Sequence, residues 1–242
     1  MSHRALKVAS YNIHACVGTD ARYDPPRVAR VLAELNCDVL GLQEVDDRCP
    51  PQDGLLQFRY FQQVTGMTAI DGPAIHDDRG CYGNALLTRL SVRRARRLDL
   101  SHRAREPRGA IDAVLQGPTG PIRVLVTHLG LHPRERGEQI RTLIGALKED
   151  WGNRGDGFPR DLPTLLLGDM NEYLPTGPRI RELKARFAAG FHRGSWPSFW
   201  PLLPLDRIYS DPAPRRAAFR IHRTPTARRA SDHLPVKLTL GW

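Results

Sequence analysis

The 242-residue sequence lacks long apolar segments. Its purely apolar runs, such as those at 124–126 and 165–167, are a few residues long, whereas a membrane-spanning helix needs about 20 apolar residues. The amino-terminal segment MSHRALKVASYNIHA has no apolar core of the kind that secretory signals contain. We therefore expect a cytoplasmic protein without a membrane-spanning helix.

Cysteine is scarce and shows no pattern. The four cysteines form no C-x-x-C pair and have no histidine at zinc-finger spacing; they are Cys16, Cys37, Cys49 and Cys81. In a reducing compartment such cysteines are free, partly buried thiols. The sequence predicts neither a disulfide framework nor a zinc site.

Lysine is also scarce, because only four of the 36 basic residues are lysine and the rest are arginine. The net charge of +10 favours phosphate-bearing partners. A G·C-rich coding sequence also gives an arginine-rich chain with 20 prolines and 21 glycines, so the charge by itself does not choose the partner.

The composition is that of a folded protein, with 40% hydrophobic and 26% charged residues. Without repeats or a long linker, we expect one domain over residues 1–242. Period-two alternation and buried apolar runs predict strands at 6–13, 38–44, 82–89, 91–100, 110–116, 121–128, 164–169, 205–210, 217–222 and 235–240. Helical spacing predicts helices that begin at Pro26, at 134–151 and near 178–188. This mixture indicates an α/β or α+β layered fold.

Polar side chains stand at or next to the ends of these apolar strands. Each has an ordinary structural explanation when taken alone, such as a turn, a cap or a hydrogen-bonded core residue. Their joint occurrence is what points to a site. The residues are Asn12, His14, Glu44, His128, Asp169, Asn171, Asp206, Asp232 and His233.

The motifs around these residues resemble those of the endonuclease/exonuclease/phosphatase superfamily. They occur in the family order from the first predicted strand to the last: SYNIH at 10–14, LQEVD at 42–46, YGNALLTR at 82–89, VTHLG at 126–130, LLLGDMN at 165–171, PLDRIYS at 204–210 and SDHLPV at 231–236. The resemblance implies an α/β fold, a four-layer sandwich of two packed mixed β-sheets flanked by helices.

The resemblance also implies roles in phosphoester hydrolysis with Mg²⁺, for which Mn²⁺ is a substitute. Glu44, Asn12 and Asp232 would lie on the metal side. Asp169 would activate the attacking water, and Asn171 would bind a phosphate oxygen. His233, held by Asp206, and His128, as a second positive donor, would stabilise the developing charge. The weaker candidates for phosphate contact are Asn84 and Arg108.

These residue types suit that reaction. An anionic phosphate repels the attacking oxygen, so a cation and donors must offset the charge where it develops. Several carboxylates in one place favour a bound cation. His14 follows Asn12 on the same strand face, so its side chain is expected either in the pocket or in the core. Two positions depart from the family pattern: Met170 replaces an aromatic, and Arg207 would place a charge near the substrate rim.

The sequence leaves the substrate open. Nucleic acid is favoured by the basic charge, and a phospholipid headgroup or small phosphate ester is the alternative; no stable protein partner is predicted. A noncatalytic binding module is disfavoured, since Glu44, Asp169 and His233 are all present. Loops at 14–25, 45–66 and 190–204 are expected to set specificity. In the last of these loops we expect the aromatic residues to pack the loop rather than to stack on bases or rest on lipid; they are Trp196, Phe199 and Trp200.

Overall fold

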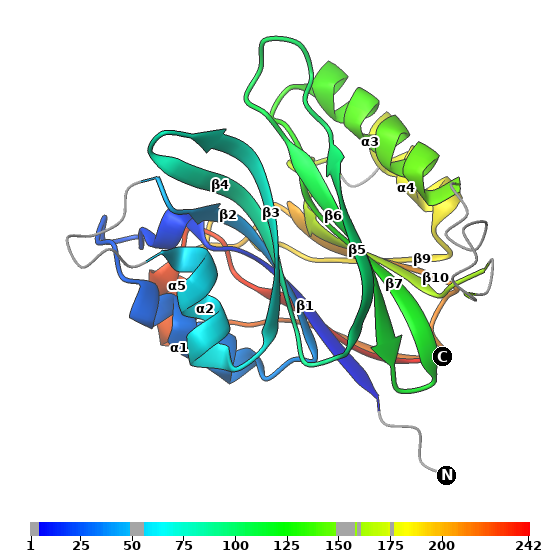
Figure 1. Cartoon of the computed structure of the whole chain (residues 1–242), viewed down its shortest axis with the longest axis horizontal. Helices are drawn as coiled ribbons and strands as arrows, with labels where there is room; N and C mark the ends of the chain where they lie inside the picture. Colours follow the sequence, from blue (N-terminus) through cyan, green and yellow to red (C-terminus); the bar gives the residue numbers. More distant parts are fainter. Residues whose placement is uncertain (1–4, 49–55, 149–157, 159–160, 175–176) are drawn as a thin grey trace.

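Two six-stranded β-sheets pack face to face, and helices cover their outer faces (Figure 1). The structure is a computed structural model, which describes residues 5–48, 56–148, 158, 161–174 and 177–242. None of the helices in these ranges combines the length and the apolar content that crossing a bilayer requires. The four-layer α/β sandwich expected from the sequence is confirmed.

The first sheet is mixed, with β1 and β2 parallel and the other neighbours antiparallel. Its strands in spatial order are β11 (Arg216–Ile221), β12 (Val236–Gly241), β1 (Leu6–Asn12), β2 (Val39–Asp46), β4 (Gly80–Thr88) and β3 (Thr68–Asp77).

The second sheet is mixed in the same way, with β7 and β8 as its parallel pair. Its strands in spatial order are β5 (Val92–Asp99), β6 (Gly109–Gly117), β7 (Gly120–His128), β8 (Thr164–Asp169), β10 (Asp206–Asp211) and β9 (Ala189–His192).

The helices form the two outer layers (Figure 1). The first sheet is covered by α1 (Pro25–Leu35), α2 (Gln57–Thr65) and α5 (Pro225–Ala230), and the second by α3 (Pro133–Lys148) and α4 (Pro178–Arg186). A short 3-10 turn, η1 (His14–Cys16), follows β1. The start of α1 is fixed by Asp24, whose carboxylate accepts a hydrogen bond from Arg27 N at 2.8 Å while prolines occupy the first helical turn.

Three apolar clusters separate the four layers. Strand alternation sends neighbouring side chains into different clusters. On β8, Leu165 and Leu167 enter the cluster between the two sheets, and Leu166 enters the cluster beneath α3 and α4. This two-sided burial explains why the strand reads as a continuous apolar run in the sequence.

The strand registers bring distant sequence motifs to one end of the sandwich. Asn12 pairs with Gln43, which precedes Glu44, at the ends of β1 and β2. His128 is opposite Asp169 across the parallel β7–β8 pair, and Asp169 is in turn opposite Asp206 on β10. The polar ends of the strands therefore meet in space.

Gly168 permits the close approach of β7 and β8 just before this meeting point. A Cβ at Gly168 would lie 2.2 Å from the carbonyl oxygen of Thr127. Only glycine fits there without a shift of the backbone.

Every predicted strand and helix that lies in the described residues is present, with ends shifted by a few residues. The predicted helix 134–151 runs to Lys148, and residues 149–151 lie outside the described part of the chain. Within the described residues, five elements were not predicted from the sequence, which are η1, α2, β3, β9 and α5. The prediction of 45–66 as a loop is thus wrong for its two ends, which belong to β2 and α2; residues 49–55 lie outside the description.

The cysteines for which the structure gives a position are free thiols, as predicted: Cys16, Cys37 and Cys81. Cys49 lies outside the described residues.

Candidate active site

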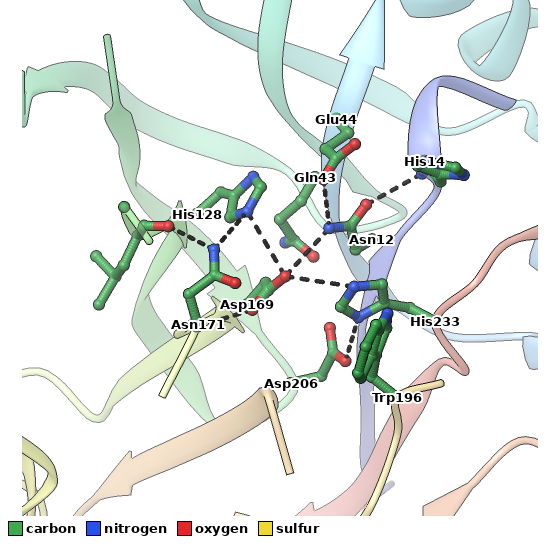
Figure 2. Close-up of polar contacts among 12 residues, drawn as sticks. Asn12, His14, Gln43, Glu44, His128, Asp169, Asn171, Trp196, Asp206 and His233 are labelled. Carbon is green, nitrogen blue, oxygen red and sulfur yellow. Dashed lines mark hydrogen bonds and ion pairs between the residues drawn. The ribbon is translucent and has the colours of Figure 1, made fainter. Parts of the chain in front are cut away.

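Asp169 is the centre of a buried polar cluster at the end of β8 (Figure 2). Its Oδ2 accepts a hydrogen bond from Asn12 Nδ2 at 3.1 Å and lies 3.5 Å from His128 Nε2 and 3.7 Å from His233 Nε2. Its Oδ1 accepts the backbone N–H of Asn171 at 2.8 Å. One carboxylate therefore joins side chains from β1, β7 and the segment before β12.

His233 lies between two carboxylates. Its Nδ1 is 2.8 Å from Asp206 Oδ2, and its Nε2 faces Asp169 (Figure 2). Burial by itself lowers the pKa of His233, but the charges of Asp206 and Asp169 outweigh burial and raise it to about 10. His233 is therefore protonated at neutral pH and can act as a proton donor. This agrees with the predicted Asp206–His233 pair.

His128 has the opposite charge state. Burial lowers its pKa to about 3, and the neighbouring Arg108 lowers it further while Asp169 opposes both. The role of His128 as a second positive donor stays a prediction; burial and the guanidinium of Arg108 favour its neutral form. The positive charge at this position belongs to Arg108, whose Nη1 lies 3.0 Å from His128 Nδ1 and whose Nη2 lies 2.8 Å from Glu106 Oε1.

His128 lies between two groups that only donate hydrogen bonds. The guanidinium of Arg108 faces its Nδ1, and Asn171 Nδ2 lies 3.0 Å from its Nε2 while donating to Leu129 O at 2.7 Å. A neutral imidazole has one acceptor nitrogen, so His128 accepts from only one of these two neighbours. Arg108 and Asn171 thus bring more donors than His128 can accept, and the oxygen of an anion can accept from the donor that is left over.

Asn12 and Glu44 form a second polar pair beside Asp169. Asn12 Nδ2 lies 2.8 Å from Glu44 Oε1 (Figure 2). Glu44 sits at an irregularity in the β2–β4 pairing, between Leu42 and Val45, and has a φ of 58°. Such a bulge re-aims a side chain out of the regular alternation, and here it holds the carboxylate toward Asn12.

Asp232 reaches this pair indirectly. Its Oδ1 lies 3.8 Å from His14 Nδ1, and the backbone N–H of His14 donates to Asn12 Oδ1 at 3.0 Å. Its Oδ2 accepts a hydrogen bond from the indole Nε1 of Trp196 at 3.0 Å. His14 was expected either in the pocket or in the core. The structure favours the pocket, since this histidine is partly exposed on η1 and joins Asn12 to Asp232.

The two weaker candidates have different surroundings. Arg108 is buried at the site, in the contact with His128 described above. Asn84 is also buried, and its Nδ2 donates to Gly109 O at 2.9 Å, which ties β4 of one sheet to β6 of the other. Asn84 Oδ1 is buried without a hydrogen-bond partner. Its contact with a phosphate stays a prediction.

Arg207 does not place a charge at the substrate rim, and that expectation is wrong. The side chain is fully buried, and its Nη2 donates to Glu172 O at 2.5 Å. The reason is strand alternation on β10: Asp206 faces the site, so the next side chain points to the other face of the sheet. Met170 is buried in the apolar cluster beneath α3 and α4.

Two groups of residues could hold a divalent cation. One is the Asn12–Glu44 pair beside Asp169. The other is Asp169, Asp206 and His233, which each offer a ligand atom within 4.8 Å of the others. In the second group the short Asp206–His233 distance is that of a hydrogen bond, so a cation there would have to replace a proton of His233.

Sequence reasoning missed several residues that support the site. Ser231 Oγ donates to Asn12 O at 2.8 Å and accepts the backbone N–H of His233 at 3.1 Å, so it joins the two halves of the cluster. Its place directly before Asp232 and His233 was an available signal. Glu106, the partner of Arg108, gave no such signal, nor did the contact of Trp196 with a residue 36 positions away.

Comparison of the sequence with known proteins identifies the family that the sequence motifs resemble. The sequence model described as "Endonuclease/Exonuclease/phosphatase family" matches residues 9–233. The chain is also 31% identical over 254 aligned residues to YbhP of Escherichia coli K12, an alignment that covers 96% of this chain and 94% of YbhP. The chain belongs to the endonuclease/exonuclease/phosphatase family. Members of this family are hydrolases that act on phosphoester bonds.

Solved structures share the fold. An endonuclease/exonuclease/phosphatase from Beutenbergia cavernae superposes with a TM-score of 0.75 at 22% identity, covering 98% of this chain and 72% of that one. A mannosyl-6-phosphatase from Bacteroides thetaiotaomicron gives 0.75 at 19% identity, with 98% and 100% covered. The catalytic domain of human Nocturnin with a bound sulfate anion gives 0.70 at 18% identity, with 98% and 93% covered. At these identities the likeness shows the fold.

Proposed function

We propose that this protein hydrolyses phosphodiesters with the help of a divalent cation. The observation that carries the proposal is the surroundings of Asp169, whose Oδ2 is within 4 Å of Asn12, a neutral His128 and a protonated His233. A proton acceptor, a proton donor and donors for an anion are thereby within reach of one bound phosphate group.

The residues around Glu44 fit a divalent cation. Glu44 and Asp169 are two carboxylates that both accept from Asn12 Nδ2, at 2.8 and 3.1 Å. Burial raises the pKa of Glu44, and the charge of Asp169 raises it further, whereas Asn12 and His233 lower it. A cation between the carboxylates would relieve their repulsion and desolvation. Oxygen donors suit Mg²⁺ or Mn²⁺.

Glu44 would hold this cation, and Asn12 and Asp232 are the other predicted ligands. Asn12 presents Nδ2 to Glu44 and Asp169 while its Oδ1 accepts the His14 N–H, so its amide would have to turn to bind the cation through oxygen. When bound, the cation supplies positive charge that stabilises a phosphate in its charged transition state.

The protein's own side chains carry out the proton transfers and bind the phosphate. Asp169 takes a proton from water, and the water oxygen forms a bond to phosphorus. One P–O ester bond breaks, and the leaving alkoxide takes the proton that His233 donates from Nε2. Asn171 Nδ2 donates to a phosphate oxygen beside His128, and Asp206 holds His233 in its protonated form. The products are a phosphomonoester and an alcohol.

The substrate has two candidates. Nucleic acid is the first, because the net charge of +10 attracts a polyanion. A phospholipid headgroup is the second, and it is favoured by a feature of the surface around the site, which is described in the next subsection.

Hydrolysis of bis(p-nitrophenyl) phosphate tests the reaction without a choice between these substrates. We expect turnover with Mg²⁺ or Mn²⁺ and none with EDTA. Nicking of supercoiled plasmid under the same conditions tests the nucleic-acid candidate. A folded protein that fails to hydrolyse the soluble diester at any metal concentration would contradict the proposal.

Glu44→Gln is expected to lower the affinity for the cation, while activity at saturating metal changes less. The substitution removes one charge and keeps the shape, so the metal concentration for half-maximal activity should rise by about tenfold or more, in the range found for perturbed metal sites. Excess Mg²⁺ should restore part of the activity. The measurement is a metal titration of diester hydrolysis, with the exposed Asp161→Asn as the matched control. Loss of activity that no metal concentration restores would show that Glu44 is not a ligand.

A further inference from the structure

Large apolar side chains are exposed mainly beside the site. Among the described residues, eight large hydrophobic side chains are exposed, and six of them lie on three loops that adjoin the site. We call these six the apolar rim: Leu131, Tyr173, Leu174, Phe199, Trp200 and Leu202.

Each loop of the apolar rim begins at or is bonded to the site. Leu131 is three residues beyond His128, and Tyr173 is two residues beyond Asn171. The third loop, between β9 and β10, is bonded to Asp232 twice, through the indole of Trp196 at 3.0 Å and the backbone N–H of Ser198 at 2.6 Å. All three loops of the apolar rim are therefore connected directly to residues of the site.

The loop with the most exposed aromatic side chains is held in place by hydrogen bonds. Trp196 and Leu203 form a β-bridge, and Arg228 Nη1 donates to the carbonyl oxygens of Ser198 and Phe199 at 3.1 and 3.0 Å. Yet the side chains of Phe199 and Trp200 are 72% and 67% exposed. The expectation that these two aromatics pack the loop is wrong, because the bonds order the backbone and leave the rings outside.

An ordered loop that presents apolar side chains to water indicates a surface for a partner. Basic residues stand next to it. A pocket of about 420 Å³ lies between the starts of α3 and α4. Its charged lining has more arginines than glutamates: Arg103, Arg134, Arg141 and Arg179 against Glu138 and Glu182. Pro133, also in its lining, is two residues beyond Leu131. The partner should thus combine an apolar phase with negative charge.

We propose that the apolar rim docks this protein on an anionic phospholipid bilayer, and that its substrate is a phosphodiester of a phospholipid headgroup at that surface. The second half rests on the proposed function. A bilayer interface accepts Leu, Phe, Trp and Tyr together, with arginines at the headgroup phosphates. Nucleic acid fits less well, because three of the six rim residues are leucines, which have no ring to stack on a base.

Co-sedimentation with vesicles tests the docking in the presence of EDTA, so that no turnover is needed. Wild-type protein should bind vesicles of phosphatidylcholine with phosphatidylglycerol more tightly than vesicles of phosphatidylcholine alone. Phe199→Ala/Trp200→Ala should lower binding to the mixed vesicles by about tenfold or more, since two aromatic side chains no longer leave water. Val64→Ala, which truncates an exposed apolar side chain near the end of α2, is the matched control and should bind like wild type.

Two readouts separate docking from a folding defect and from nucleic-acid binding. The double variant should hydrolyse bis(p-nitrophenyl) phosphate at the wild-type rate, because Phe199 and Trp200 are outside the reacting group. Vesicles should shift the tryptophan emission of wild type to the blue, and Trp200→Phe should remove most of that shift. If instead the double variant binds vesicles like wild type but loses affinity for single-stranded DNA, the proposal is overturned in favour of base stacking.

Failure of the docking and failure of the function give different results. Hydrolysis of the soluble diester without vesicle binding would contradict the docking proposal but not the proposed phosphodiesterase function. Vesicle binding without hydrolysis of either the soluble diester or phosphatidylglycerol would overturn the function and the substrate half of this proposal. Release of a headgroup product from the mixed vesicles, reduced by the double variant, would support both.

Discussion

Asp169→Asn should lower kcat for diester hydrolysis by about 10²–10⁴-fold, the range in which a positioned proton acceptor contributes. The amide has the shape of the carboxylate but takes no proton from water. Oδ1 can still accept the backbone N–H of Asn171, so the turn after β8 should keep its conformation. The measurement is steady-state hydrolysis of bis(p-nitrophenyl) phosphate, with circular dichroism to show that the fold survives.

The matched control for Asp169→Asn is again Asp161→Asn, the same substitution at an exposed position near the start of β8. It should leave kcat unchanged. A folded Asp169→Asn protein with wild-type turnover would contradict the assignment of Asp169 as the proton acceptor. Loss of secondary structure in that variant alone would instead give Asp169 a structural role.

Asp206→Asn should move the alkaline limb of the pH–rate profile toward neutral pH. In the wild type, Asp206 and Asp169 raise the pKa of His233 to about 10, so His233 remains a proton donor until the pH passes that value. Without the charge of Asp206, the pKa of His233 should fall toward its ordinary value of 6.5. The measurement is kcat against pH for both proteins. An unchanged alkaline limb would show that Asp206 does not set the protonation of His233.

The same raised pKa has a consequence for stability. A histidine whose pKa is higher in the folded state stabilises that state below its unfolded pKa of 6.5, and the contribution is lost as the pH rises to about 10. The free energy of unfolding of wild type relative to His233→Gln should therefore decrease over that interval, as measured by urea titrations at several pH values. Asp206→Asn should reduce the decrease, since less of the shift then remains.

Local pattern was enough to predict most strands and helices. On β8 the run Leu165–Leu167 is apolar because both faces of the strand are buried, and on α1 the helical spacing and the prolines agree with the structure. The missed elements lack such patterns. β3 is an edge strand with a glycine, a proline and mostly half-exposed side chains, and α5 has six residues.

By itself, then, the sequence determined the layered fold class and the residue types of the site, because strand periodicity and the polar ends of strands are local properties of the chain. The tertiary structure decided three other matters. Arg108 and burial make His128 neutral, although Arg108 lies 20 positions away from it. Alternation on β10 buries Arg207, and the bonds of the loop after β9 leave Phe199 and Trp200 in water. Charge state and exposure depend on which distant groups surround a side chain, and only the folded chain specifies those neighbours.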